Sequence, residues 1–164
     1  MPKLIAVLEA NPARVEKMKV WLDDRLYMYD RSIESDLPSL LAVLRQRLSD
    51  ILILCLDQVT LEKPLRRADG FSEVVLSPWA ILEDCLMSSP RPFPILIHGD
   101  HSATQVIPLL SSAWKLWPIH FVTSDAGSHW VGDAWFPALR DSLEDTEPQE
   151  PLSDVLVDSN LQGG

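Results

Sequence analysis

The residues FPILIHGDHSATQ, at positions 93 to 105, join an apolar run to a group of titratable side chains. The apolar run is followed directly by His98. After Gly99, two more titratable residues follow, Asp100 and His101. An imidazole is suited to general acid or base catalysis near neutral pH, and a nearby carboxylate can orient its ring. Many α/β proteins build a site where a buried strand ends in such residues before a helix. The alternative interpretation is that the strand simply leaves the core and that His98 is a capping or core histidine.

Five short apolar runs predict the β-strands that would position these side chains. They lie at residues 3–8, 26–29, 51–56, 94–97 and 119–122. The third run, ILILCL, is apolar at every position instead of alternating, which is typical of a strand in the centre of a parallel sheet with both faces covered. We therefore expect helices on both faces of the sheet.

Capping signals predict the helices between these strands. Asn11-Pro12 and Ser35-Asp36 with Pro38 open the first two helices, and Ser102 with Gln105 forms a capping box for a helix over about 103–116. The segment 71–88 has a helical pattern interrupted by a proline, which predicts two short helices or one kinked helix. A last helix is expected over about 130–143.

The alternation of strands and helices predicts a doubly wound parallel sheet in one α/β domain over residues 1–143. Residues 144–164 form an acidic C-terminal extension with six acidic residues and no Lys or Arg. A small apolar set in this extension has near-helical spacing, so we expect the extension to dock on its own domain or on a partner. Solvated disorder is the alternative.

In such a sheet, sites lie beyond the carboxyl ends of the strands. The chemically useful residues expected there are Glu9 after the first strand, Asp57 after the third, His98 to His101 after the fourth, and Thr123 after the fifth. We expect the ring of His98 to face Asp57 or Glu9. The side chains of Asp100 and His101 are expected to be largely solvated.

Several short strings resemble the cyclic-phosphate-processing receiver family, an offshoot of phosphotransfer receivers. VLEANPARVEKM (7–18) is similar to the family's opening LxLEDNPxRxxxM, CLDQVT (55–60) lies where the family carries LDHD, and PILIHGDH (94–101) resembles its His-Ser strand ending. The resemblance covers residues 3–143. It implies a flavodoxin-like, receiver-type sheet of five parallel strands in the order 2-1-3-4-5, and activity on cyclic phosphate ends of nucleic acids.

The residues that depart from the family pattern indicate a degenerate pocket. Glu9, Asp57 and His98 keep the family's residue types, whereas other polar positions of the pocket are changed. The changes are Ala10 for an acid, Gln58 for His, Val59 for Asp and Gly99 for Ser. The chain also has no Lys after position 115, so the ammonium group that follows strand five in phosphotransfer receivers is missing.

Composition narrows the class of partner. The net charge is −10 and the chain has no basic stripe, which argues against a broad nucleic-acid surface, although a short phosphate end in a pocket stays open. No apolar run approaches the roughly 18 residues that span a bilayer, and the start lacks a signal-peptide pattern, so we expect a cytoplasmic protein without membrane contact. The cysteines Cys55 and Cys85 lie in apolar segments, and we expect both thiols to be reduced and inaccessible.

These observations predict a receiver-like regulatory or protein-interaction module with a degenerate pocket, not a working phosphotransfer switch. Its partner would be another protein, and it would need no cofactor. The alternative is a phosphoesterase-like enzyme that processes cyclic or terminal phosphates of nucleic-acid ends with His98 and Asp57 as the catalytic pair. The binding pocket would then comprise Glu9, Asp57, His98, Asp100, His101 and Thr123. A divalent cation on Glu9 and Asp57 is the one cofactor that this pocket would suit.

Overall fold

A five-stranded parallel sheet forms the centre of the molecule. The computed structural model describes residues 3–63, 65–68, 73–100, 114, 117–125 and 127–146. The sheet strands are β1 (Leu4–Leu8), β2 (Asp30–Glu34), β3 (Ile51–Asp57), β6 (Ile95–Gly99) and β7 (Ile119–Thr123). Their order is β2-β1-β3-β6-β7, and every pairing is parallel. The predicted order 2-1-3-4-5 is therefore confirmed.

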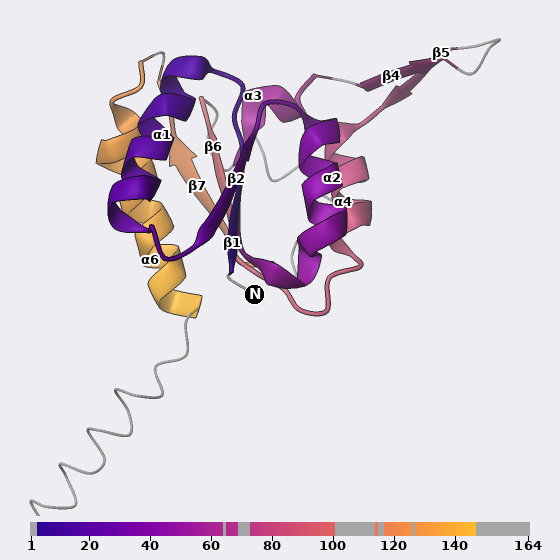
Figure 1. Ribbon diagram of the computed structural model, residues 1–164. Coiled ribbons are helices and arrows are strands. Elements are labelled where there is room, and N and C mark those ends of the chain that lie inside the picture. Colours follow the sequence, from indigo (N-terminus) through magenta and orange to yellow (C-terminus); the bar gives the residue numbers. More distant parts are fainter. Residues whose placement is uncertain are drawn as a thin grey trace, which may run out of the picture.

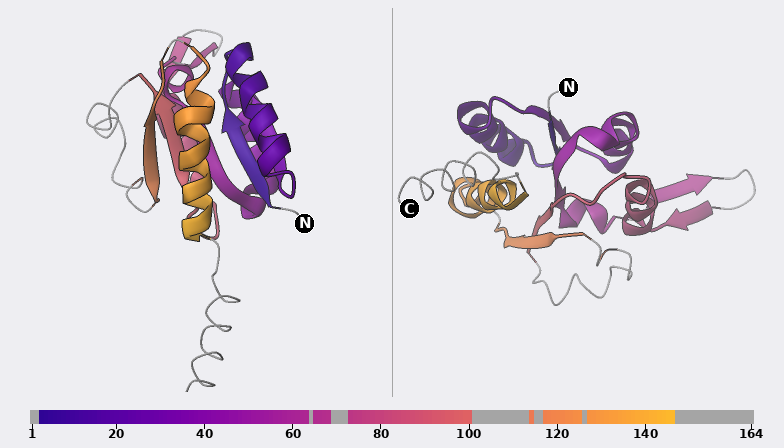
Figure 2. Two further views of the ribbon diagram at one scale, coloured as in Figure 1. Left: turned by 90° about the vertical axis from the view of Figure 1, so that its left-hand side faces the viewer. Right: turned by 90° about the horizontal axis from the view of Figure 1, so that it is seen from below.

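Helices cover both faces of this sheet (Figure 1). They are α1 (Pro12–Arg25), α2 (Leu37–Arg47), α3 (Gln58–Leu61), α4 (Pro78–Leu86) and α6 (Phe136–Thr146). A 3-10 turn, η1 (Leu48–Asp50), follows α2, and a π-helical turn, η4 (Val131–Trp135), leads into α6. Helices α1 and α6 lie on one face, and α2 and α4 lie on the other (Figure 2). The result is a three-layer α/β/α arrangement.

The core consists of one apolar cluster on each face of the sheet. The α2 and α4 cluster buries leucines of both helices together with Trp79 against β1, β3 and β6. The α1 and α6 cluster buries Met18 and Leu22 of α1 against Trp135, Leu139 and their neighbours. Strand β3 supplies buried side chains to both clusters, since Leu54 belongs to one and Ile53 to the other. This is why ILILCL is apolar at every position.

The N-terminal caps lie where the sequence predicts them. Asn11 accepts hydrogen bonds from the backbone N–H groups of Ala13 and Arg14 at the start of α1. Asp36 caps α2 by accepting from Ser39, at 2.8 Å. Both helices therefore begin at the carboxyl edge of the sheet, beside the strand ends that carry the candidate site.

The predicted strand at residues 26–29 is wrong. Helix α1 continues to Arg25, the next residues form a turn, and Tyr27 and Met28 are exposed at 74% and 54%. The strand is β2, whose sequence DRSIE is mostly polar because β2 is an edge strand and no side chain in it is fully buried. Aromatic residues favour strands, but here the helix extends up to them and they end in a turn.

A two-stranded hairpin precedes α4, where a helix was predicted. Strands β4 (Leu65–Ala68) and β5 (Glu73–Leu76) pair antiparallel, and the ribbon projects away from the three layers (Figures 1 and 2). The run EVVL is rich in β-branched residues, which favour extended backbone. Pro78 does not interrupt a helix but occupies the first position of α4, which Ser77 caps.

Two further predictions lie wholly or partly outside the described residues. The helix predicted over 103–116 falls on residues that the structure does not describe, apart from Trp114. The part of the C-terminal extension after Thr146 also lies outside the described residues. The predicted last helix is present as η4 followed by α6, which runs three residues past position 143. In the part of the chain that the structure describes, no helix is both long and apolar enough to cross a lipid bilayer.

Candidate functional site

Three strand ends bring Glu9, Asp57 and His98 together at the carboxyl edge of the sheet. Glu9 follows β1, Asp57 is the last residue of β3, and His98 lies next to Asp57 in the register of β3 and β6. Their relative exposures are 1%, 3% and 0%. The sheet order places these strands side by side, so residues that are 41 to 89 positions apart in the chain form one buried polar cluster.

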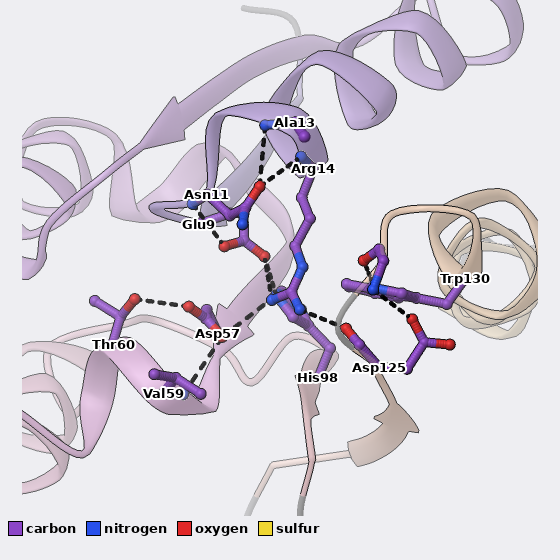
Figure 3. A network of polar contacts seen from close by, with 11 residues as sticks. Glu9, Asn11, Ala13, Arg14, Asp57, Val59, Thr60, His98, Asp125 and Trp130 are labelled. Carbon is purple, nitrogen blue, oxygen red and sulfur yellow. Dashed lines mark hydrogen bonds and ion pairs between the residues drawn. The ribbon is translucent and has the colours of Figure 1, made fainter.

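The ring of His98 faces both acids, as the sequence predicted. Its Nε2 atom lies 3.0 Å from Oε1 of Glu9 and 3.9 Å from Oδ1 of Asp57 (Figure 3). The second oxygen of Glu9, Oε2, accepts a hydrogen bond from the backbone N–H of Asn11 at 3.0 Å. Glu9 is therefore held in place by the turn that starts α1.

Asp57 serves as the N-terminal cap of α3. Its Oδ1 atom accepts a hydrogen bond from the N–H of Val59 at 3.3 Å, and its Oδ2 atom accepts from the hydroxyl of Thr60 at 2.7 Å. Both carboxylate oxygens are thus engaged by the first turn of the helix that follows. A residue in this position fixes the local backbone as well as carrying charge.

Arg14 reaches into the cluster from the first turn of α1. Its Nη1 atom lies 3.7 Å from Oε1 of Glu9, and its Nη2 group donates a hydrogen bond to the carbonyl oxygen of Asp125 at 2.6 Å. The guanidinium carbon lies 5.2 Å from the ring centre of Trp130. Only 13% of the Arg14 side chain is exposed, and Figure 3 shows it between the strand ends and Trp130.

Trp130 completes the cover over His98. The two ring centres are 5.2 Å apart with an interplanar angle of 38°, and the indole N–H of Trp130 donates to the carbonyl oxygen of Gly127 at 2.9 Å. The Nδ1 atom of His98 has no hydrogen-bond partner among the described residues. An aromatic ring and a cation therefore close the cluster on the side of β7.

Gln58 and Gly99 pack closely against each other, and they stand at the positions where the resembled family has His and Ser. Gln58 is 2% exposed, and its side-chain amide donates to Oε1 of Glu62 at 2.9 Å. A Cβ atom at position 99 would lie 2.6 Å from Cβ of Gln58, which is closer than real side chains approach. Gly99 is thus required by the packing of Gln58 at the start of α3.

The pKa values of the two buried carboxyl groups are shifted in opposite directions. Burial raises the pKa of Glu9, but the hydrogen bond and charge of His98, the N–H of Asn11 and the charge of Arg14 outweigh it, so the pKa lies below its ordinary value. Burial and then the charge of Glu9 raise the pKa of Asp57 above its ordinary value, against the smaller opposing effects of His98, Thr60 and Val59. The surroundings therefore favour the ionised form of Glu9 more than that of Asp57.

Asp100 and Thr123, two of the other predicted pocket residues, lie outside the buried cluster. Asp100 and Thr123 are exposed, and His101 lies outside the described residues. Ala10 is also exposed, and it lines a groove of about 240 Å³ with Ser35, Asp36, Leu37, Pro38, Thr60, Lys63 and Pro78. Of the six residues in the predicted pocket, Glu9, Asp57 and His98 thus form a buried group, and Asp100 and Thr123 are exposed.

Arg14 and Trp130 are the site residues that the sequence reasoning missed. Arg14 lies in the string NPARVEKM, which carries part of the family resemblance, and Trp130 lies at the start of the predicted last helix. The usable signal for Arg14 was its position in the first turn of a helix that begins at the carboxyl edge of the sheet.

The cluster also has the donor atoms of a metal site. One ligand atom from each of Glu9, Asp57 and His98 can be chosen so that all three lie within 4.8 Å of one another. Two carboxylates and one imidazole fit the preferences of Mn²⁺, Fe²⁺ or Zn²⁺ better than those of Mg²⁺, which favours oxygen ligands and water. The guanidinium of Arg14 lies beside these atoms, and its positive charge opposes a second cation.

The fold of this chain is found in several solved structures. The signal receiver domain of an HD domain-containing protein from Pseudomonas fluorescens Pf-5 has a TM-score of 0.57 and 12% identity, with 88% of each chain covered. A CheY-like response regulator receiver domain protein from Methanospirillum hungatei JF-1 has a TM-score of 0.52 and 11% identity, covering 88% of this chain and 99% of the other. This chain has the receiver fold.

A third such structure is the signal receiver domain of a putative LuxO repressor protein from Vibrio parahaemolyticus, with a TM-score of 0.51 and 14% identity over 95% of this chain and 98% of the other. No family model matches the sequence, and a search of curated proteins finds no match. At identities this low, the receiver likeness establishes the architecture alone, and it agrees with the flavodoxin-like sheet predicted from the sequence.

Proposed function

We propose that this chain is a regulatory module that acts by binding another protein and does not switch by accepting a phosphoryl group. The receiver fold supports the class of module, since the similar structures are signal receiver domains. The observation that carries the second half of the proposal is the state of Asp57. Both of its carboxylate oxygens are engaged by the first turn of α3.

Phosphoryl transfer to a carboxylate needs an oxygen that the phosphoryl donor can reach and cations that compensate the transferred charge. Asp57 is 3% exposed, and its neighbour across the cluster is Glu9, another carboxylate. Ala10 stands where a second metal-binding acid would be needed, and no lysine follows position 115. These features favour a module that keeps the receiver architecture without its phosphotransfer chemistry.

The hairpin of β4 and β5 is the surface that we propose for the partner. A two-stranded ribbon alone is marginally stable in water, and its outer edges offer unpaired backbone groups. An extended strand of another protein can pair with such an edge. The hairpin projects from the layers that form the core, so a partner can reach it without disturbing the buried cluster (Figure 1).

Incubation with acetyl phosphate and Mg²⁺, followed by intact mass measurement, tests the absence of phosphotransfer. We expect no stable gain of phosphate. A gain in the wild type that disappears in Asp57→Asn would overturn the proposal.

The surface is tested separately by placing a photo-crosslinking residue at position 67, in β4. The matched control carries the same residue at position 140, an exposed site on α6. We expect a discrete cross-linked protein only from position 67. Equal yields from both positions would contradict the hairpin surface.

A second candidate function is a phosphoesterase that acts on a cyclic or terminal phosphate of a nucleic-acid end. The observation that favours it is the contact of one imidazole, His98, with two carboxylates, which suits proton transfer. The resemblance to the cyclic-phosphate-processing receiver family points the same way. A substrate would need Arg14 and Trp130 to move aside, because His98 is fully buried.

Cleavage of a 2′,3′-cyclic nucleotide or RNA end tests the enzyme directly. If the activity exists, His98→Ala should lower it by roughly 10²–10⁴-fold while the fold is retained. We expect no cleavage above background by the wild type, with or without divalent metal. Cleavage that depends on His98 would make the second candidate the better one.

A further inference from the structure

We propose that the guanidinium of Arg14 is a built-in cation that closes the Glu9, Asp57 and His98 cluster, and that its removal opens a site for a divalent transition-metal ion. The inference rests on the geometry of the cluster. It holds whether or not the chain binds another protein through its hairpin.

Glu9 and Asp57 are two carboxylates with almost no exposure, and a buried charge is costly unless it is paired. The described ion pairs of Glu9 are with Arg14 at 3.7 Å and His98 at 3.0 Å. A guanidinium carries a lasting positive charge in proteins, so Arg14 places one where a divalent cation would otherwise compensate the acids.

Arg14 is held in place at both its backbone and its guanidinium end. The side chain of Asn11 accepts from the N–H of Arg14 itself at 3.1 Å, so the helix start sets the position of its backbone. At the far end, the guanidinium donates to Asp125, which is 111 positions away, and lies over the ring of Trp130. Asp125 is anchored in turn, because its Oδ1 atom accepts from the N–H of Gly127 at 2.8 Å.

The consequence is that Arg14 ties α1 to the connection between β7 and η4 across the buried cluster. Its guanidinium donates a hydrogen bond to the carbonyl oxygen of Asp125 and lies over the ring of Trp130. Trp130 in turn lies against His98. The positive charge and the closure of the cluster are therefore properties of one side chain. A substitution that removes both should uncover the acids and the imidazole together.

Once uncovered, the ligand atoms of Glu9, Asp57 and His98 would suit a divalent transition-metal ion. The Nε2 atom of His98 already points at Glu9 and Asp57, and the donor atoms lie within 4.8 Å of one another. An ion about 2.0–2.3 Å from each donor bridges separations of this size after small side-chain shifts. The Nδ1 atom of His98 has no described partner, so affinity should be weaker than at a site whose histidine is supported by a second hydrogen bond.

The experiment compares Mn²⁺ binding by wild type, Arg14→Met and Arg14→Lys at neutral pH by titration calorimetry. Methionine has a similar length and no charge, whereas lysine keeps the charge without the planar fork. We expect Arg14→Met to bind one Mn²⁺ at least about tenfold more tightly than the wild type, because a like charge about 4 Å from the ion is gone. Arg14→Lys should bind Mn²⁺ no better than the wild type.

Two controls locate the effect. Adding His98→Ala to Arg14→Met should abolish the gained binding, and Arg140→Met, on the exposed face of α6, should leave binding at the wild-type level. Hydrogen exchange gives an independent readout, since Arg14→Lys should speed exchange of the amides near Asp125 and Trp130 while the central strand β3 stays protected. Equal Mn²⁺ affinity of wild type and Arg14→Met, or gained binding that survives His98→Ala, would overturn the proposal. Unchanged exchange in Arg14→Lys would overturn the tie to Asp125.

Discussion

The Nε2 atom of His98 lies 3.0 Å from Oε1 of Glu9, although the two residues are 89 positions apart in the chain. Both side chains are buried, and the contact is possible because β1 and β6 flank β3 in a parallel sheet. The pair joins the ends of strands that form the centre of the fold. Its removal should therefore change stability as well as chemistry.

Glu9→Gln should lower the free energy of unfolding at neutral pH by about 1.5–3 kcal/mol, the range for hydrogen bonds to a charged group. The folded-state pKa of Glu9 is lowered, so its stabilising effect is fully present above the ordinary glutamate pKa of roughly 4.3. It is lost as the pH falls through the lowered folded value. Urea unfolding across this pH range should show the difference between variant and wild type shrinking toward acid pH, and a difference that grows would contradict the assignment.

Asp57→Asn should change the free energy of unfolding in the opposite direction. Burial raises the pKa of Asp57 in the folded state, so the ionised carboxylate carries a cost at neutral pH that vanishes as the pH falls below its ordinary value of roughly 3.9. Asparagine is also a good helix cap, so α3 should be kept. We expect the variant to be more stable than wild type at neutral pH, with the gain disappearing in acid. A loss of stability at neutral pH that is recovered in acid would show that the Asp57 charge is stabilising.

Gly99→Ala should destabilise the protein by about 1–3 kcal/mol through overpacking against Gln58. The new Cβ would lie 2.6 Å from Cβ of Gln58, so shortening Gln58 to alanine cannot remove the clash, whereas Gln58→Gly can. A double-mutant cycle by thermal unfolding should give a favourable coupling for Gly99→Ala with Gln58→Gly and a smaller one with Gln58→Ala. Simple additivity with Gln58→Gly would mean that the two positions do not share space.

The two cysteines should differ in reactivity. Cys55 is fully buried in β3, and burial raises its pKa, so a thiol reagent should label it only when the protein unfolds. Cys85 is half-buried, and its pKa is also raised, first by burial, so it should label slowly in the native protein. The sequence-based expectation that both thiols are inaccessible is thus corrected for Cys85. Rapid labelling of Cys55 without denaturant would contradict its place in the core.

Much of the fold could be predicted because its signals are local. The capping residues Asn11 and Asp36 open the helices where the sequence indicates, and the unbroken apolar run of β3 marks the central strand. The errors lie where tertiary context decides. Strand β2 is polar because it lies at the edge of the sheet, and EVVL is extended because it pairs with the residues of β4.

The candidate site could be predicted only as far as strand ends determine it. Glu9, Asp57 and His98 each follow a buried run, and parallel strands bring such residues to one edge. Arg14 could not be found in this way, because its role depends on the helix that carries it and on a backbone carbonyl 111 residues away. The reason for Gly99 likewise becomes visible only when the side chain of Gln58 is placed beside it.

We propose that Asp57 does not act as a phosphoacceptor. The most direct test is a comparison of backbone NMR spectra before and after addition of beryllofluoride, a phosphoryl mimic, with Mg²⁺. We expect unchanged amide resonances for Val59, Thr60 and Asn11, because Asp57 is buried and its carboxylate is held by the first turn of α3. Saturable shifts at Val59 and Thr60 that spread to Thr123 at the end of β7, and that are absent in Asp57→Asn, would contradict it.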